Sequence, residues 1–435
     1  MHQMSNSRLL KIKSFFKNFG PGWITGAADD DPSGIATYSQ AGAQFGFATL
    51  WMALFQFPMM AVVQEICARI GLVTGGGLAG VVKKRYSKKI VYPIVSLLLI
   101  ANTMNIGADI GAMSASVKLV LPDLPIVVVT ILFTTLVTCA EIFIPYKKYV
   151  TVLKYLTLSL LAYMITAFIV GRNWTEILIA SIVPHVEFTP AFAMLFVAIF
   201  GTTISPYLFF WHASEEAEED VTTNKIKNIG EGVPKIRNKE IKAMRKDVVI
   251  GMAFSQIIML FIIITTAETL HVHGLTDIVT ADQAAKALEP LVKTFPHSGE
   301  LAKIIFALGV IGVGLLAIPV LAGSSAYALS EQFGWKQGLS KKFRQAKGFY
   351  LIIAASTVIG LWINFADVDP IKALIYAAVI NGVIAVPLLV VIIKVGNDKK
   401  ILGGRTNGKI SNVIGWITVA VMGFAAAVMF LTWLK

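Results

Sequence analysis

The stretch Gly26-Ala27-Ala28-Asp29-Asp30-Asp31-Pro32-Ser33-Gly34 places three carboxylates and a proline inside an otherwise apolar run that covers residues 20–45. A run of this length matches what a bilayer core about 30 Å thick requires of one spanning helix. Pro32 lacks an amide donor and clashes with the preceding turn, and Gly34 adds backbone freedom, so we expect the helix to unwind here. Ionisable groups at membrane depth are costly and mark functional positions. The stretch is therefore the first candidate site.

Apolar runs of similar length recur along the whole chain of 435 residues. Hydrophobic residues make up 56% of the sequence and charged residues only 15%, whereas a soluble domain carries about 25% charged residues. This composition excludes an ordinary soluble enzyme and predicts an all-α membrane protein. We expect eleven transmembrane helices, at residues 20–45, 47–70, 91–117, 124–144, 150–170, 190–214, 247–270, 301–330, 348–366, 371–394 and 411–434.

The basic residues that give the net charge of +12 lie mostly in the loops on one side of the expected membrane. If the N-terminus is cytoplasmic, all but seven of the 38 Lys and Arg residues fall on the cytoplasmic side, as the positive-inside rule demands. The expected location is the plasma (inner) membrane, with the N-terminus inside and the C-terminus outside. The lipid bilayer is the expected partner. No basic face with interleaved aromatic residues suggests a nucleic acid, and no obligate protein partner is evident.

A second interrupted helix appears in the sixth span, as Gly201-Thr202-Thr203-Ile204-Ser205-Pro206-Tyr207. The first and sixth spans each open a set of five, and interruptions at matching places in two halves indicate an inverted-repeat transporter with its site at the midplane. The expected organisation is a cytoplasmic tail (1–19), a first repeat (20–170), an inverted second repeat (190–394) with a cytoplasmic loop (215–247), and an added eleventh helix (411–434).

The ends of the broken helices predict the charge of the substrate. Free carbonyl groups near Ala27 and Ala28, and near Thr202 and Thr203, carry the partial negative charge of a helix C-terminus. The carboxylate of Asp31 adds to it, so we expect a cation. Capping of the following half-helix accounts for one of the three aspartates, not for all.

The stretches Gly20-Pro21-Gly22-Trp23 through Asp31-Pro32-Ser33-Gly34 to Gln40-Ala41-Gly42-Ala43-Gln44-Phe45-Gly46, and Ala68-Arg69-Ile70-Gly71-Leu72-Val73-Thr74-Gly75, resemble the first two helices of the NRAMP family of divalent-metal transporters. The resemblance implies a LeuT-like five-plus-five fold with broken helices 1 and 6. Where that family has Asp-Pro-Gly-Asn and Met-Pro-His, this chain has Asp31-Pro32-Ser33-Gly34 and Ser205-Pro206-Tyr207. This pattern is similar to the NRAMP-related magnesium transporters, which implies Mg²⁺ and Mn²⁺ as cargo and alternating access.

The loss of the amide and thioether ligands agrees with a hard cation. Thioethers favour softer transition metals, whereas carboxylate, carbonyl and hydroxyl oxygens suit Mg²⁺ and Mn²⁺. Mg²⁺ also keeps several waters when bound. We expect a partly hydrated cation between Asp31, the Thr202 carbonyl and the hydroxyl of Ser205 or Tyr207, with Gly34 and Asp30 beside it. No resident cofactor is expected.

Proton coupling is expected to be weak or absent. In the family that this sequence resembles, proton coupling is associated with the first-helix Asp, a sixth-helix His and acidic residues on the third helix. Here Tyr207 replaces the histidine, and a phenol with an ordinary pKa of about 10 is a poor proton carrier at neutral pH. Asp109 stands in the place of one third-helix acid. Asp109, Asp29 and Asn105 are candidates for the pathway or a proton relay, and helix-to-helix hydrogen bonding is the alternative for Asp109 and Asn105.

Other functions remain open at this point. They are a proton-coupled Mn²⁺ or Fe²⁺ transporter, a sodium-coupled organic-substrate transporter, a channel, and an intramembrane aspartyl protease using Asp31 and Asp109. The protease signature Gly-x-Gly-Asp is absent, because Gly107-Ala108 precedes Asp109, and no P-loop or nucleophile elbow occurs. The chain is therefore not expected to be an enzyme. Loop 215–247 is predicted to be a solvated connector. Glu65 and Arg69 are four residues apart on one helix face and are predicted to form an ion pair.

Overall fold

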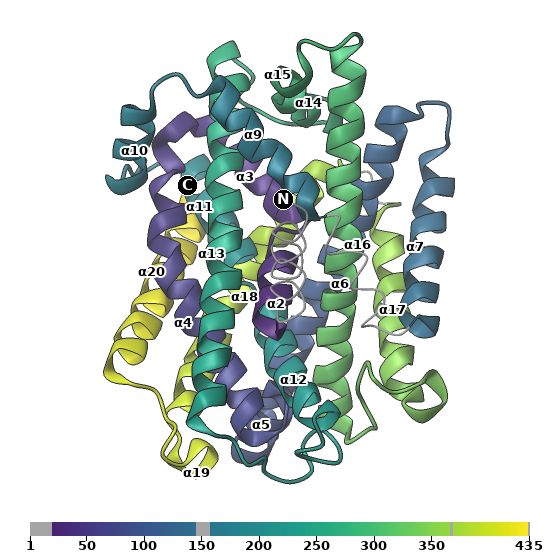
Figure 1. Ribbon diagram of the computed structural model, residues 1–435, viewed down its shortest axis with the longest axis vertical. Coiled ribbons are helices and arrows are strands. Elements are labelled where there is room, and N and C mark those ends of the chain that lie inside the picture. Colours follow the sequence, from purple (N-terminus) through teal and green to yellow (C-terminus); the bar gives the residue numbers. More distant parts are fainter. Residues whose placement is uncertain (1–19, 145–156, 366–368, 434–435) are drawn as a thin grey trace, which may run out of the picture.

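The apolar runs of the sequence form helices that lie side by side along the long axis of the molecule (Figure 1). The computed structural model describes residues 20–144, 157–365 and 369–433, and no β-strand occurs among them. Eight of the described helices are long and apolar enough to cross a membrane. The bundle consists of α2 (Pro21–Asp29), α3 (Pro32–Phe45), α4 (Trp51–Thr74), α6 (Lys88–Val120), α7 (Ile126–Phe143), α9 (Leu161–Val170), α11 (Pro190–Thr203), α12 (Pro206–Thr222), α13 (Asn238–Thr269), α16 (Ser298–Phe333), α17 (Lys347–Ile363), α18 (Pro370–Gly396) and α20 (Lys409–Trp433).

Short helices join these spans at the two ends of the bundle. One end carries α5 (Leu78–Arg85) and α19 (Lys399–Leu402), and the other carries α10 (Trp174–Ile182), α14 (Ala281–Ala285) and α15 (Glu289–Val292) (Figure 1). The remaining short elements are the 3-10 turns η1 (Gly46–Thr49), η2 (Thr157–Leu160), η3 (His271–His273), η4 (Lys286–Leu288) and η5 (Phe343–Gln345). Each expected span overlaps a helix, and the start of the fifth, at residues 150–156, lies outside the described residues.

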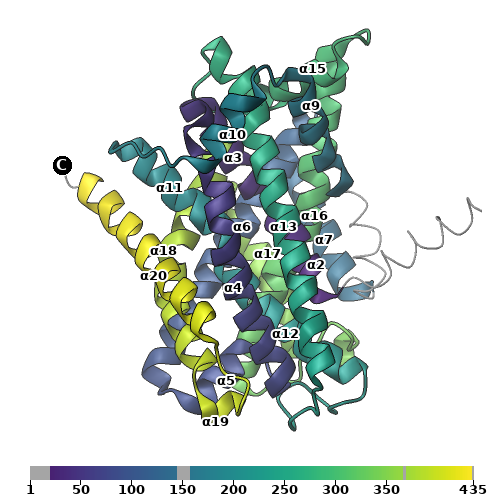
Figure 2. The ribbon, with the colours of Figure 1, turned by 60° about the vertical axis from the view of Figure 1, so that its left-hand side comes forward.

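The helices α2, α3, α11 and α12 lie inside the bundle, and peripheral helices surround them. Both broken segments are almost fully buried along their length. In contrast, α20 runs along the outside (Figure 2), where Phe424 and Leu431 expose 69% and 62% of their surface. Exposed apolar side chains on an outer helix are what contact with lipid tails requires. The arrangement therefore isolates the two helix breaks from the bilayer.

The prediction of a solvated connector from residue 215 was wrong for its first part. Helix α12 continues to Thr222, and Glu218 is buried within it. The Glu218 carboxylate accepts hydrogen bonds from the Leu339 and Ser340 amides and from the Tyr327 hydroxyl. Because these donors come from α16 and the loop after it, the acidic side chain is buried with partners that lie more than 100 residues away.

The half-helix α2 packs against the start of α13 with almost no space between the two backbones. A Cβ atom on Gly26 would lie only 2.2 Å from the Gly251 carbonyl oxygen. At the N-terminus of α2, the Asp247 carboxylate of α13 accepts hydrogen bonds from the amides of Gly20 (3.2 Å), Gly22 (2.8 Å) and Trp23 (3.4 Å). Asp247 thus caps a helix that precedes it by more than 220 residues, which satisfies amides that every helix N-terminus leaves free.

Replacement of Asp247 by alanine is expected to destabilise the protein by about 1–3 kcal/mol, because partly buried amides of α2 lose a charged acceptor. Asp247→Asn keeps one carbonyl oxygen and is expected to recover part of this loss. A thermal unfolding curve of the purified protein in detergent measures both. The neighbouring Lys246→Ala is the control, since Lys246 is exposed. Equal unfolding temperatures for Asp247→Ala and Lys246→Ala would show that the Asp247 cap of α2 does not stabilise the protein.

Candidate metal centre

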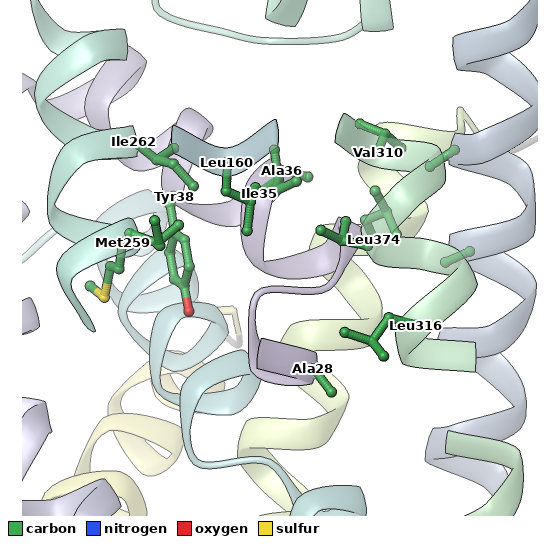
Figure 3. Packing of buried hydrophobic residues seen from close by; sticks show 14 of the residues in the cluster. Ala28, Ile35, Ala36, Tyr38, Leu160, Met259, Ile262, Val310, Leu316 and Leu374 are labelled. Carbon is green, nitrogen blue, oxygen red and sulfur yellow. The ribbon is translucent and has the colours of Figure 1, made fainter. Parts of the chain in front are cut away.

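The first helix break falls between α2 and α3, at Asp30 and Asp31. Asp31 is extended, with φ −68° and ψ 174°, and Pro32 is the first residue of α3. Proline is well tolerated at this position because its missing N–H would have no partner in any case. The break therefore lies just before Pro32, and Gly34, which we expected to unwind, belongs to the first turn of α3. Figure 3 shows the connecting loop, with Ala28 at the end of α2 and Ile35 and Ala36 in α3.

The second break lies between α11 and α12, at Ile204 and Ser205. Ser205 is extended, with φ −92° and ψ 137°, and Pro206 begins α12. In a continuous helix the carbonyl of residue i accepts from the amide of residue i+4. For Ala28 and for Thr202 that residue is Pro32 and Pro206, which have no N–H. The two prolines therefore leave one carbonyl unpaired within each broken helix.

The carboxylate of Asp31 lies at the centre of the first break. It is fully buried. Its Oδ1 accepts from the Ser33 hydroxyl (2.6 Å) and from the Gly34 amide (2.8 Å), and its Oδ2 accepts from the Asn105 amide (2.9 Å) of α6. All three donors are neutral. Asp31 thus caps α3 and places a carboxyl group in the interior, between the two breaks.

Hydroxyl groups connect the two breaks. The Tyr207 hydroxyl donates to the unpaired Ala28 carbonyl at 3.0 Å and lies 3.5 Å from the Asp31 Oδ2. The hydroxyls of Ser33 and Thr202 are 3.2 Å apart. These contacts bring Asp31, Thr202 and Tyr207 together from segments separated by about 170 residues. The hydroxyl of Tyr207 thus satisfies the carbonyl of α2, whereas the matching carbonyl of Thr202 has no helical donor.

Gly34, Asn105 and Ser205 complete the surroundings. A Cβ on Gly34 would lie 3.4 Å from the Thr202 hydroxyl oxygen, so a larger side chain would extend between the two breaks. The Ser205 hydroxyl, the Asn105 side-chain oxygen and both carboxylate oxygens of Asp109 are buried with no hydrogen-bond partner among the described residues. Asp109 lies four residues from Asn105, on the same face of α6. The centre therefore offers hard oxygen donors beyond those already paired.

Asp29 and Asp30 form hydrogen bonds to α13. Both carboxylates accept from the hydroxyl of Ser255 on α13, with Asp30 at 3.3 Å. The place of Asp30 beside the cation stays a prediction; one of its carboxylate oxygens is hydrogen-bonded on the α13 side of the break. Ser255, Ser33 and Tyr38, whose hydroxyl lies 3.1 Å from the Thr203 hydroxyl, were not predicted as site residues. Ser33 directly follows Pro32 and lies only two residues after Asp31. This short separation is the sequence signal from which its role could have been predicted.

One expected structural role, the Glu65–Arg69 ion pair, is confirmed, and a further buried amide joins two helices. Asn102 donates to the Leu321 carbonyl and the hydroxyls of Ser324 and Ser325, which joins α6 to α16. Arg69 and Glu65 form an ion pair at 3.1 Å. The His271 and His273 side chains bond to backbone carbonyls, His271 to Ala43 at 2.9 Å and His273 to Thr269 at 2.7 Å. The described residues contain no group of three His, Cys, Asp or Glu that could hold a metal ion.

The site is closed on the side of α14 and α15. The space there is about 10 Å³, close to the minimum for one water molecule. Its lining is mostly apolar, and Figure 3 shows four of these residues, Ile35, Ala36, Val310 and Leu374, beside the break. Hydrocarbon contacts therefore separate Asp31 from that end of the bundle.

Solved structures with this fold are transporters. The manganese transporter of Eremococcus coleocola, in complex with an aromatic bis-isothiourea substituted compound, matches with a TM-score of 0.68 and 16% identity, over 96% of this chain and 87% of that one. MhsT in complex with L-phenylalanine matches with a TM-score of 0.60 and 10% identity, over 94% of this chain and 98% of that one. The all-α, LeuT-like architecture with two broken helices is thus confirmed.

Sequence relatives give the family. The divalent metal cation transporter MntH of Klebsiella pneumoniae (strain 342) is 26% identical over 420 residues, which covers 93% of this chain and 91% of the relative. MntH of Pectobacterium carotovorum is 24% identical, over 93% and 91%. The profile of the Natural resistance-associated macrophage protein-like (Nramp) family matches residues 22–432. The chain therefore belongs to the NRAMP family.

Proposed function

We propose that this protein is a divalent-metal transporter that carries Mg²⁺ and Mn²⁺ as partly hydrated ions. The observation that supports it is the donor set around Asp31. The oxygen atoms that meet there are the Asp31 carboxylate and the hydroxyls of Ser33, Thr202 and Tyr207. Ser205 stands at the position of the family's methionine. Oxygen donors suit hard divalent cations, and Mg²⁺ is held by one or two carboxylates with several waters.

Asp31 is proposed to supply the charge, and the Thr202 carbonyl the second direct contact. This carbonyl has no helical donor because Pro206 follows four residues later. The hydroxyls of Ser205 and Tyr207 are proposed to bind the waters of the ion or the ion itself. Gly34 leaves the space for those waters, since any side chain there would approach Thr202.

The orientation is proposed with the N-terminus in the cytoplasm and the C-terminus outside. The basic loops support it, because α5 and α19, with Lys83, Lys84, Arg85, Lys399 and Lys400, lie at the same end of the bundle (Figure 1). The two repeats are proposed at residues 20–170 and 190–394.

The test is uptake into liposomes that contain the purified protein, with Mg²⁺, Mn²⁺, Ca²⁺ and internal pH followed in parallel. We expect saturable entry of Mg²⁺ and Mn²⁺ without acidification that depends on the cation. The second candidate is a proton-coupled Mn²⁺ or Fe²⁺ transporter, which the unpaired carboxylate of Asp109 favours. Transition-metal entry with acidification and no Mg²⁺ flux would establish that candidate and overturn the proposal.

Replacement of Ser205 by methionine is expected to change the selectivity. A thioether at this position prefers softer ions, so Cd²⁺ uptake should rise relative to Mg²⁺ uptake by about tenfold. Competition between the two ions in the liposome assay measures the ratio. Ser330→Met is the matched control, because Ser330 is a second buried serine without a hydrogen-bond partner for its hydroxyl among the described residues, on α16. An unchanged ratio in Ser205→Met would show that Ser205 does not face the ion.

A further inference from the structure

A larger cavity lies at the end of the bundle that carries α10, away from the Asp31 site. Its volume is about 590 Å³, within the range of pockets that hold small molecules. Its walls come from the end of α3 with η1 (45–48), from α10 and the residues around it (172–185), and from the end of α13 (267–272). We refer to it as the α10 pocket. Because the 14 residues of α3 rise about 20 Å, the pocket is distinct from the break at Asp31.

The α10 pocket presents charges of both signs. Arg172 contributes a guanidinium, and Glu176 of α10 and Glu268 of α13 contribute carboxylates. Arg172 and Glu176 are exposed, so the pocket opens to the surface. Glu268 accepts from the backbone amide of Arg172 at 3.3 Å, and Glu176 accepts from the side-chain amide of Asn173 at 3.3 Å. These partners are neutral, and no ion pair joins Arg172 to a carboxylate among the described residues. The three charges are therefore available to a ligand.

The outer face of α10 is apolar. Leu178, Ile179 and Ile182 each expose more than half of their surface, whereas Ile177 is buried against the bundle. Val183 is exposed to the same extent and also lines the pocket. Helices that lie in the membrane interface present such a face to lipid chains. The lipid-facing side of α10 is thus continuous with the wall of the pocket.

Two tryptophans mark the level of the pocket in the membrane. Trp51 begins α4, and its indole N–H donates to the carbonyl of His185, a pocket residue, at 3.0 Å. Trp174 begins α10. Tryptophan is enriched where the bilayer meets water. The α10 pocket therefore lies at the depth of lipid headgroups.

These features fit the headgroup of a zwitterionic phospholipid with a primary ammonium. A guanidinium binds phosphate through two parallel hydrogen bonds, which suits Arg172. An ammonium donates up to three hydrogen bonds, and the carboxylates of Glu176 and Glu268 are acceptors for them. A choline headgroup carries the positive charge but has no N–H to donate. An anionic headgroup without an ammonium would place its charge beside two carboxylates.

We propose that the α10 pocket binds phosphatidylethanolamine from the leaflet at this end of the bundle. The phosphate binds Arg172, the ammonium binds Glu176 and Glu268, and the acyl chains lie along the apolar face of α10. The bound lipid contacts the ends of both α3 and α13, so its binding free energy stabilises the folded protein. Lipid binding here is a property beyond the proposed transport, and it is independent of the cation that the protein carries.

The first experiment is native mass spectrometry of the full-length protein in detergent, with equal amounts of phosphatidylethanolamine, phosphatidylcholine and phosphatidylglycerol. We expect phosphatidylethanolamine to be retained about tenfold more than either of the others, because a charged hydrogen bond is gained. Equal retention of the three lipids, or a preference for phosphatidylglycerol, would overturn the proposal. Phosphorylethanolamine, the same headgroup without acyl chains, is expected not to displace the lipid at equal concentration. Displacement would exclude a lipid as the occupant.

Two substitutions test the two ends of the headgroup separately. Arg172→Gln is expected to lower the retention of phosphatidylethanolamine about tenfold, because the phosphate loses a charged donor. Glu176→Gln is expected to reduce the preference for phosphatidylethanolamine over phosphatidylcholine, because the ammonium loses a carboxylate. The matched controls are Lys293→Gln and Glu289→Gln, which remove the same charges from exposed residues at α15, at the same end of the bundle. Their lipid retention is expected to equal that of the wild type, and an equal loss in the controls would overturn the site.

The unfolding temperature distinguishes lipid binding from a structural role of Arg172. In detergent without added lipid, Arg172→Gln is expected to unfold at the wild-type temperature, since the substituted side chain is exposed. Added phosphatidylethanolamine is expected to raise the unfolding temperature of the wild type and of both control variants, but not that of Arg172→Gln. A rise in Arg172→Gln equal to that of the wild type would overturn Arg172 as the residue that binds the phosphate.

Discussion

Replacement of Asp31 by asparagine is expected to reduce Mg²⁺ and Mn²⁺ uptake by about 100-fold, which corresponds to roughly 2.7 kcal/mol. Asparagine caps a helix as well as aspartate does, so the Gly34 amide and the Ser33 hydroxyl keep an acceptor. What is lost is the formal charge that faces Asn105 and Tyr207 between the two breaks. Initial rates in the liposome assay, at matched protein content, measure the effect.

The control for this prediction is Asp369→Asn. Asp369 also precedes a proline and caps a helix, since its carboxylate accepts from the Ile371 amide at 2.9 Å at the start of α18. The two substitutions therefore make the same change in capping chemistry at two places in the fold. Asp369→Asn is expected to transport normally. Equal rates for both variants, at wild-type level, would exclude Asp31 as the residue that binds the cation.

Replacement of Gly201 by alanine is expected to abolish transport and destabilise the fold. A Cβ at this position would lie 2.0 Å from the Ala378 carbonyl oxygen and 2.4 Å from the Gly382 amide nitrogen of α18. Both are backbone atoms, so α11 and α18 must separate, at a cost of about 1–3 kcal/mol or more. Because Thr202 follows directly, the shift also moves the carbonyl proposed to bind the ion. Thermal unfolding and uptake report the two effects separately.

Gly423→Ala provides the comparison, because it makes the same substitution inside a spanning helix. On α20 the nearest atom to such a Cβ is a Val386 methyl carbon at 3.5 Å, an ordinary contact. The unfolding temperature and the uptake rate of Gly423→Ala are expected to stay at the wild-type level or to improve slightly, since alanine favours the helix. If Gly201→Ala behaved in the same way, close packing of α11 on α18 would not be required at the site.

The sequence by itself determined the spanning helices and the two breaks at Pro32 and Pro206. Pro32 and Pro206 act through local geometry, because each removes one amide and clashes with the turn before it. These effects do not depend on the rest of the fold, so the extended residues Asp31 and Ser205 lie directly before the prolines. The spans followed from apolar length alone, since a bilayer imposes the same requirement on every helix.

Only the tertiary structure decided which partners each of the three aspartates meets. The motif singles out Asp31 in the sequence but does not give the partners of the three carboxylates. Asp31 meets Asn105 of α6, while Asp29 and Asp30 meet Ser255 of α13. The same holds for Glu218 and Asp247, whose carboxylates accept from amides more than 100 residues away. The physical reason is that a buried charge is stabilised by its partners, and those partners are brought together by helix packing rather than by neighbours along the chain.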